Sequence, residues 1–391
     1  MPKSRRTTPR TPRTRALLAA AALVLPLLTA LAAPAGAAEA AALPTASVSM
    51  GDSYISGEAG RWQGNSLTTS GSRSGTDRAY SGGGYDPSRV YGATYASGCD
   101  RSDVAEIRSA ATISQNQINL ACSGAVTTNV FRAANGGQSY KGEAPQADQL
   151  AVVARQYNVK LITLSIGGND LGFADVISSC VQDYLIWYSY CHDDQQGTVD
   201  AAMAGAMAGV GKSVDEIRAV MSAAGYAAGS YRIVLQSYPS PLPRSSENRY
   251  PESGWSRANT GGCPFWDQDA DWARDSLVPQ ISSGLAGVAA AKGVQFLDLR
   301  DLLQGREICS KSTKLATSSS APSATTSEWA RWLDMGTSTQ GTLQESFHPN
   351  YYAQLALGRC LTLLNAQPSG NWSCRNTAGK DTTGVYLAAR S

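Results

Sequence analysis

Histidine is scarce in this chain of 391 residues, which has only His192 and His348. The two histidines lie far apart, and the eight cysteines do not form the closely spaced pairs of a zinc finger, so the sequence offers no structural zinc site. After residue 38 the chain also lacks a tract of lysine and arginine that would track a phosphate backbone, which argues against nucleic-acid binding. No apolar run after residue 38 is long enough to span a bilayer, and we therefore expect a soluble protein.

The first residues differ in composition from all that follow. Residues 3–15 include six basic side chains and no acidic one, and an apolar run to about Ala33 then ends in the small residues 35–38. This order predicts a secretory signal peptide over residues 1–38 and a secreted, extracellular protein. A membrane anchor is the alternative, and Ser4-Arg5-Arg6 leaves a twin-arginine export signal open. Removal of the segment leaves 27 basic and 31 acidic side chains, a net charge near −4.

All eight cysteines lie after this leader. An even number of cysteines in an exported protein indicates disulfides, which stabilise a fold outside the cell. Eight cysteines allow 105 connectivities, and we expect sequential pairing because local closure is the simplest of them. The expected bridges are Cys99–Cys122, Cys180–Cys191, Cys263–Cys309 and Cys360–Cys374.

Buried-strand patterns alternate with helical patterns along the chain. Continuous apolar strands between helices indicate a parallel sheet covered on both faces, with the functional site at the carboxyl ends of the strands. We interpret residues 39–391 as a single domain in which residues 58–118 and 310–335 are loop-rich insertions. The predicted strands are 45–50, 160–166, 231–238 and 294–299, and the predicted helices are 147–157, 198–224, 267–292 and 350–365.

Two of the predicted strands end in polar turns that contain glycine. The first runs into Gly51-Asp52-Ser53, where a serine flanked by glycine can present its hydroxyl at the sheet edge. The second runs into Gly167-Gly168-Asn169-Asp170, where the Asn169 amide is a donor suited to stabilising an oxyanion. Taken singly, the first is also an ordinary helix cap and the second an ordinary turn.

Two further segments carry candidate groups. Residues 119–125 contain Gly124, whose N–H either points into a cleft or belongs to a simple turn. In Glu345-Ser346-Phe347-His348-Pro349, the acid can orient the histidine, which then takes a proton from a serine. A lone histidine is more often structural. The other one, His192, lies in a predicted loop beside Cys191 and two aspartates.

These four segments, in this order, resemble the SGNH hydrolase family, also called GDSL lipases and esterases. The family pattern is a Gly-Asp-Ser block, a glycine block, a Gly-x-Asn-Asp block and an Asp-x-x-His-Pro block. The resemblance spans most of the chain after the leader and is closest to the secreted actinomycete branch of esterases, lipases and phospholipases. It implies a flavodoxin-like three-layer α/β/α sandwich with a central parallel sheet.

The resemblance also implies roles for individual residues. Ser53 would be the nucleophile and His348 the general base, and the N–H groups of Ser53 and Gly124 would form the oxyanion hole with the side chain of Asn169. Glu345 stands where the family usually has aspartate, and its longer side chain can still reach a histidine ring. A backbone carbonyl at this position is the alternative orienting group in some members of the branch, and Asp334 is a weaker candidate. This chemistry requires no metal and no organic cofactor.

The predicted reaction is two-step acyl transfer through an acyl-enzyme. We expect a secreted serine ester hydrolase acting on lipid esters, a phospholipase A or B or a lipase that releases fatty acids. An esterase for carbohydrate acetyl or phenolic (feruloyl-type) esters is the first alternative, and a non-catalytic carbohydrate-binding module the second. A histidine base predicts activity that falls below its ordinary pKa of about 6.5.

Aromatic residues offer two candidate substrate contacts. Residues 183–190 lie between Cys180 and Cys191, and this segment could contact a lipid surface transiently, line an acyl groove, or pack against the body of the protein. A second cluster near the histidine, Trp329, Trp332 and Phe347, could wall the cleft. The expected partner is a lipid or another ester substrate, and we expect a monomer.

Overall fold

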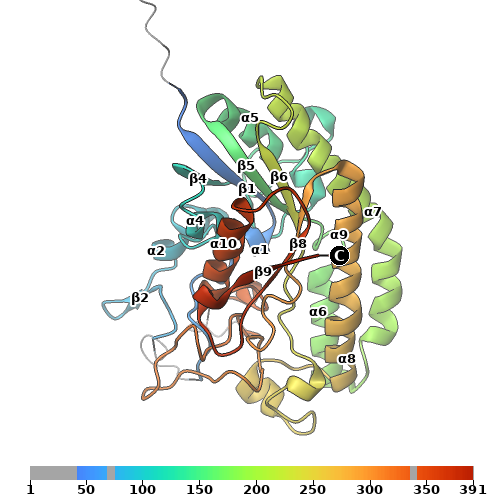
Figure 1. Cartoon of the computed structure of the whole chain (residues 1–391). Helices are drawn as coiled ribbons and strands as arrows, with labels where there is room; N and C mark the ends of the chain where they lie inside the picture. The colour runs from blue at the N-terminus through green and yellow to red at the C-terminus, as the bar shows by residue number, and fades with distance from the viewer. Residues whose placement is uncertain (1–41, 68–74, 335–340, 391) are drawn as a thin grey trace, which may run out of the picture. The chain divides into compact units, whose positions relative to one another are not determined.

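The apolar runs of the sequence form one central sheet (Figure 1). The computed structural model describes residues 42–67, 75–334 and 341–390, and within them the sheet has seven strands in the order β4-β1-β5-β6-β7-β8-β9. The predicted signal peptide over residues 1–38 lies outside the described residues. The strands are β1 (Thr45–Gly51), β4 (Asn116–Asn119), β5 (Asn158–Ser165), β6 (Arg232–Gln236), β7 (Gln295–Asp298), β8 (Trp372–Arg375) and β9 (Tyr386–Ala389).

The pairing of the strands confirms the predicted fold class. All neighbours from β4 to β8 run parallel, and only β9 is antiparallel, to β8. With β8 and β9 set aside, the strands numbered in chain order follow 2-1-3-4-5, which is the flavodoxin-like order. Two neighbouring inner strands, β1 and β5, are buried along almost their whole length. Burial on both faces is why their sequences are continuous and not alternating.

Helices cover both faces of this sheet and complete the predicted α/β/α arrangement (Figure 1). On one face α5 packs on α7, and α7 packs on α9, which also contacts β6 and β7. On the other face α10 packs on α4, which contacts β1 and β4. The bounds are α4 (Glu106–Ser109), α5 (Gln146–Gln156), α7 (His192–Ala223), α9 (Val278–Lys292) and α10 (Tyr351–Asn365).

Local capping determines where two of these helices end and begin. Gly293 ends α9 in the left-handed conformation, and the N–H of Val294 then donates to the carbonyl of Ala289 at 3.0 Å. Asn350 begins α10, and its side chain accepts from the N–H groups of Tyr352 and Ala353. Asn350 comes two residues after His348, so the histidine lies immediately before the start of α10.

Some elements differ from the sequence-based predictions. The predicted helix 267–292 is divided into α8 (Asp267–Trp272), a π-helical turn (Ala273–Leu277) and α9. Pro279 lies in the first turn of α9, where its missing N–H is tolerated. The sequence did not predict α6 (Phe173–Gln182) or the strands β4, β8 and β9. Those strands have only four residues each, too few to show a clear strand pattern.

The two predicted insertions also differ from one another. Residues 58–118 contain β4 and several short elements: the hairpin β2 (Tyr80–Ser81) and β3 (Gly84–Tyr85), and the helices α2 (Ser88–Tyr91), α3 (Thr94–Ser97) and α4. Residues 310–334 contain turns and isolated bridges and no helix in the described part of the chain.

Four disulfides join the cysteines in the predicted sequential order, and no cysteine of the described ranges is free. The bridge from Cys99 holds the end of β4, and the bridge from Cys180 closes the segment between α6 and α7. The four pairs are Cys99–Cys122, Cys180–Cys191, Cys263–Cys309 and Cys360–Cys374. None of the helices described here has the length and hydropathy needed to cross a membrane.

Candidate active site

Three of the four motif segments follow the carboxyl ends of adjacent strands. Ser53 comes after β1, which lies between β4 and β5 in the sheet. Gly124 follows β4, and Asn169 follows β5. Register links these ends: Gly51 is paired with Ser165, and the N–H of Cys122 donates to the carbonyl of Gly51 at 3.0 Å. The parallel sheet therefore places the three segments at one edge, where open α/β sheets bind their ligands.

The turn that carries Ser53 requires glycine at position 51. Gly51 has a φ of +135°, and a Cβ atom there would lie 1.8 Å from the carbonyl oxygen of Ser165. Asp52 then caps the short helix α1 (Ser53–Ser56), and its Oδ1 accepts from the N–H of Tyr54 at 3.1 Å. As the first residue of α1, Ser53 has an N–H without an acceptor in the helix.

Ser53 and His348 form a hydrogen-bonded pair. Nε2 of His348 lies 2.7 Å from Oγ of Ser53, and Nδ1 lies 3.0 Å from the carbonyl oxygen of Ser346. A carbonyl oxygen only accepts, so the proton of the neutral imidazole is on Nδ1, and Nε2 is left to accept from the serine hydroxyl. This is the geometry of a nucleophile and its general base.

The structure corrects the prediction that Glu345 orients His348. Oε1 of Glu345 accepts from the Tyr91 hydroxyl at 2.7 Å, and Oε2 accepts from the N–H of Thr342 at 3.0 Å. Glu345 ends a 3₁₀ turn that begins after Thr342, and its side chain folds back to cap the start of that turn. The orienting group is instead the carbonyl of Ser346.

The two remaining titratable candidates lie elsewhere. Asp334, the weaker acid candidate, is ion-paired with Arg331 at 3.1 Å. His192 begins α7, and its Nδ1 lies 2.7 Å from Oδ1 of the buried Asp269. Neither residue contacts the pair of Ser53 and His348.

Burial lowers the pKa of His348 to about 4, and hydrogen bonds with the backbone of Ser346 and neighbouring residues offset only part of this effect. The ring of Tyr54 lies 5.0 Å from the imidazole, and the Tyr54 hydroxyl donates to the carbonyl of Phe347 at 3.1 Å. Among the described residues no carboxylate contacts the ring to stabilise its charged form. The imidazole is therefore neutral, and able to act as a base, well below the ordinary pKa of histidine.

Two of the three predicted oxyanion donors, Gly124 and Asn169, lie on segments that are hydrogen-bonded to each other. The Asn169 side chain donates to the carbonyl of Ala125 at 2.8 Å, and the carboxylate of Asp170 accepts from the N–H and hydroxyl of Thr127. Gly124 has a φ of +81°, and within the described ranges its N–H has no acceptor. The segment after β4 is thus held against the segment after β5.

Two residues that sequence reasoning missed support the turn at Ser53. The side-chain amide of Gln146 binds both backbone groups of Gly51: Oε1 accepts from its N–H at 2.7 Å, and Nε2 donates to its carbonyl at 2.8 Å. The hydroxyl of Tyr238 donates to Asp52 at 2.5 Å and accepts from the N–H of Gly168 at 3.0 Å. Tyr238 follows the end of β6, and this position could have predicted a place at the site. Nothing in the sequence around Gln146 indicated its role.

Burial also raises the pKa of the carboxyl groups beneath the site. The pKa of Asp52 is raised to about 7 by burial, although the hydrogen bond from Tyr238 lowers it in part. Burial raises the pKa of Glu58 well above its ordinary value. Glu58 accepts from the hydroxyl of Ser123, which in turn accepts from the side chain of Gln344 at 2.7 Å. This chain of hydrogen bonds joins the segments that carry Ser53, Gly124 and His348.

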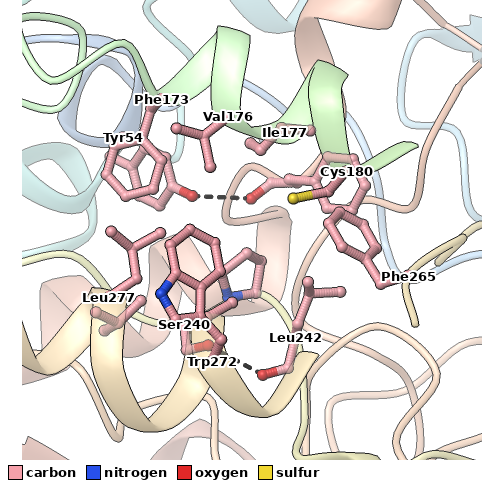
Figure 2. A pocket seen from close by; sticks show the side chains of 14 residues that line it. Tyr54, Phe173, Val176, Ile177, Cys180, Ser240, Leu242, Phe265, Trp272 and Leu277 are labelled. Atoms are coloured by element: carbon pink, nitrogen blue, oxygen red, sulfur yellow. Dashed lines mark hydrogen bonds between the residues drawn. The ribbon is translucent and has the colours of Figure 1, made fainter. Parts of the chain in front are cut away.

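An apolar pocket lies beside the segments that carry Ser53 and His348, and Figure 2 shows its lining. Tyr54 and Phe347, the neighbours of Ser53 and His348 in sequence, line one part of it, and residues of α6 line another. Its empty space is about 470 Å³, including the part open to solvent. The lining residues are Tyr54, Phe173, Val176, Ile177, Cys180, Ser240, Pro241, Leu242, Phe265, Trp272, Ala273, Leu277, Val278 and Phe347.

Only one residue of the second predicted aromatic cluster lines the pocket. Phe347 lines the pocket, whereas Trp329 and Trp332 are buried and do not belong to its lining. In the part of the chain that the structure describes, no group of three or more His, Cys, Asp or Glu side chains is placed to hold a metal ion.

The GDSL-like lipase/acylhydrolase family model matches residues 50–351. The chain therefore belongs to this family. The match covers the Gly-Asp-Ser turn and the histidine segment alike.

Individual proteins also resemble this chain. Lipase 1 of Streptomyces coelicolor is 27% identical over 208 residues, which cover 52% of this chain and 59% of that lipase, less than two thirds of its length. An extracellular lipase from Streptomyces rimosus is similar in structure, with a TM-score of 0.44 and 23% identity over 83% of this chain and 100% of that one. Phospholipase A1 from Streptomyces albidoflavus NA297 has a TM-score of 0.46 and 22% identity over the same shares.

Proposed function

We propose that this protein is a serine-dependent hydrolase of lipid carboxylic esters in which Ser53 is the nucleophile and His348 the general base. One observation carries the proposal: Nε2 of His348 lies 2.7 Å from Oγ of Ser53 beside an apolar pocket. The remaining nitrogen of the ring is held by a carbonyl, which selects the tautomer that can accept the serine proton.

The proposed reaction has two steps. His348 takes the proton of Ser53 as its oxygen attacks the ester carbonyl, and the N–H groups of Ser53 and Gly124 and the side chain of Asn169 stabilise the oxyanion. The protonated imidazole then gives its proton to the leaving alcohol. In the second step the same imidazole activates water, which attacks the acyl-enzyme and releases the acid.

The pocket favours a fatty acyl group. Its lining is almost entirely aliphatic and aromatic, and it begins at Tyr54 and Phe347, one residue from each catalytic group. Burial of an acyl chain there would stabilise the complex by about 0.8 kcal/mol for each methylene. An acetyl or feruloyl-type ester of a carbohydrate would leave most of this surface unused or place polar groups against it. We therefore propose a phospholipase A or B or a lipase. The name of the Streptomyces coelicolor relative, a lipase, agrees with this choice.

We further propose that the protein is secreted. Four disulfides with no free cysteine among the described residues are typical of oxidising compartments, where such bonds persist. The leader-like composition of residues 1–38 supports the same proposal.

The test compares the protein with its Ser53→Ala variant on p-nitrophenyl esters and on phosphatidylcholine with two different acyl chains. Mass spectrometry identifies the products. We expect fatty acid from the unmodified protein, none from Ser53→Ala, and no free choline or phosphocholine. Which acyl chain is released distinguishes phospholipase A from B.

Four outcomes would contradict the proposal. Equal activity of the two proteins would exclude Ser53 as the nucleophile. Release of choline or phosphocholine before fatty acid would exclude acyl hydrolysis. If acetylated or feruloylated carbohydrates were hydrolysed and lipids were not, the carbohydrate esterase would replace the lipid esterase. Absence of covalent labelling by a fluorophosphonate would favour the non-catalytic binding module.

A further inference from the structure

Large apolar side chains project into solvent from the loop that the Cys180–Cys191 bridge closes. Ile186, Trp187 and Tyr188 are 58%, 67% and 66% exposed, although each would lose unfavourable contact with water if it were covered. Trp255, on a separate loop, is 49% exposed. We call these four residues the aromatic patch.

Tyr184 joins the two loops of the aromatic patch. Its hydroxyl lies 3.1 Å from the carbonyl oxygens of both Glu252 and Gly254, the residue before Trp255. Its ring, which is buried, packs against Trp266 with the ring centres 4.6 Å apart. The disulfide closes the first loop behind these contacts. These buried contacts fix the two loops that carry the exposed side chains. The loops are therefore ordered before any binding, and binding loses less conformational entropy.

The patch continues the wall of the apolar pocket. Val176, Ile177 and Cys180 of α6 line the pocket, as Figure 2 shows, and a π-helical turn over Asp183–Trp187 follows directly on the end of α6. One side of this continuous segment therefore faces the acyl pocket, and its end carries the patch. A surface that covers the patch would lie next to the pocket.

Charge around the patch selects among lipid surfaces. Residues 181–190 and 251–256 contain no lysine or arginine, and their only charged residues are Asp183 and Glu252. Exposed Asp193 and Asp194 begin the following helix, α7. Anionic membranes attract basic segments, so carboxylates at this end oppose binding to them. Tryptophan and tyrosine, in contrast, favour the boundary between headgroups and acyl chains.

We infer that the aromatic patch docks the protein on the surface of a zwitterionic phospholipid aggregate, such as a phosphatidylcholine vesicle. The inference rests on the proposed function, because it supplies the surface from which a lipid would enter the pocket. Docking places Ile186, Trp187 and Trp255 at the headgroup level and the mouth of the pocket beside them. The interaction is peripheral and reversible.

The test measures vesicle binding apart from hydrolysis. The full chain carrying Ser53→Ala is titrated with phosphatidylcholine vesicles, and bound protein is separated by sedimentation. Adding Trp187→Ser and Tyr188→Ser should weaken the apparent affinity by about tenfold or more, because two large apolar contacts are lost. The control for the single variant Tyr188→Ser is Tyr386→Ser, which removes an exposed tyrosine that is not part of the aromatic patch. Tyr386 is 44% exposed. The Tyr386→Ser protein should bind as its parent does.

Hydrolysis of a soluble p-nitrophenyl ester by the same patch variants, with Ser53 intact, reports that they are folded and that the proposed chemistry holds. Failure of Ser53-dependent hydrolysis would therefore refute the proposed function, and failure of vesicle binding would refute docking alone. Docking is overturned if the parent does not bind the vesicles, or if the patch variants bind as well as Tyr386→Ser. It is also overturned if the patch variants abolish self-association, or binding to an insoluble polysaccharide, while vesicle binding is unchanged.

Discussion

The carbonyl oxygen of Ser346 lies 3.0 Å from Nδ1 of His348 and takes the place that a carboxylate has in a Ser-His-Asp triad. A carbonyl selects the same tautomer as a carboxylate but carries no full charge. It therefore stabilises the protonated imidazole less. Because the Ser346 carbonyl orients the ring, Glu345 has no direct part in the proposed reaction. A ring without a carboxylate partner is also protonated at a lower pH than one that has such a partner.

Glu345→Gln should retain activity to within about tenfold, since its side chain holds Tyr91 and Thr342 and does not contact His348. Loss of a true triad carboxylate costs about 10⁴ in turnover. The measurement is kcat/KM on a soluble p-nitrophenyl ester, with Tyr91→Phe as the control that removes the same hydrogen bond from the other side. A loss of about 10³ or more in a folded Glu345→Gln protein, without a similar loss in Tyr91→Phe, would restore Glu345 as the third catalytic residue.

Activity should persist into acid. The base works as neutral imidazole, and burial lowers the pKa of His348 to about 4. Protonation, and with it loss of kcat/KM, should therefore be half complete near pH 4 and not near the ordinary histidine value. A pH profile on a soluble ester tests this, and far-ultraviolet circular dichroism at each pH separates titration from unfolding. A profile with its midpoint at about 6.5 would show that the imidazole is more solvated than the structure indicates.

Gln146→Leu should destabilise the protein by about 1–3 kcal/mol, because it leaves the buried N–H of Gly51 without its partner and removes one of the two hydrogen bonds to the Gly51 carbonyl, which Cys122 also binds. Urea denaturation measures the change. Gln156→Leu is the matched control, since Gln156 is exposed on the same helix, α5, and should change stability by less than about 0.5 kcal/mol. If Gln146→Leu were as stable as Gln156→Leu, the two hydrogen bonds to Gly51 would contribute nothing to the turn.

Glu307 should make stability decrease as the pH rises from about 4 to about 8. Among the described residues its two carboxyl oxygens are buried without hydrogen-bond partners, and burial raises its pKa to about 8. Below the unfolded pKa of about 4.3 both states keep the proton, so the stabilising effect is complete there. Between that pH and about 8 the unfolded chain loses the proton while the folded protein keeps it, and stability falls as pH rises.

Glu307→Gln removes this titration. The free energy of unfolding, measured in urea at pH 5 and pH 8, should then fall by about 2–4 kcal/mol less than in the unmodified protein. Asp193→Asn, at an exposed position, should preserve the original dependence. An unchanged pH dependence in Glu307→Gln would mean that the Glu307 carboxyl is solvated or paired in the folded protein.

Local pattern was sufficient for much of the fold. The apolar runs at β1, β5, β6 and β7 and the helical periodicities between them predicted the parallel sheet, because strand and helix periods depend on residues close in sequence. The short polar strands β4 and β8 escaped prediction for the same reason: they belong to the sheet through their neighbours and not through their own hydrophobicity.

What the sequence determined by itself was the Gly51-Asp52-Ser53 turn and the order of the four motif segments. Each of these depends on neighbouring residues or on a pattern within the chain. Tertiary structure alone decided that Ser346 and not Glu345 orients His348, and that Gln146, 95 residues away, binds Gly51. Hydrogen-bond partners and burial are set by how distant segments pack, and packing also determines the pKa of the base and the shape of the pocket beside it.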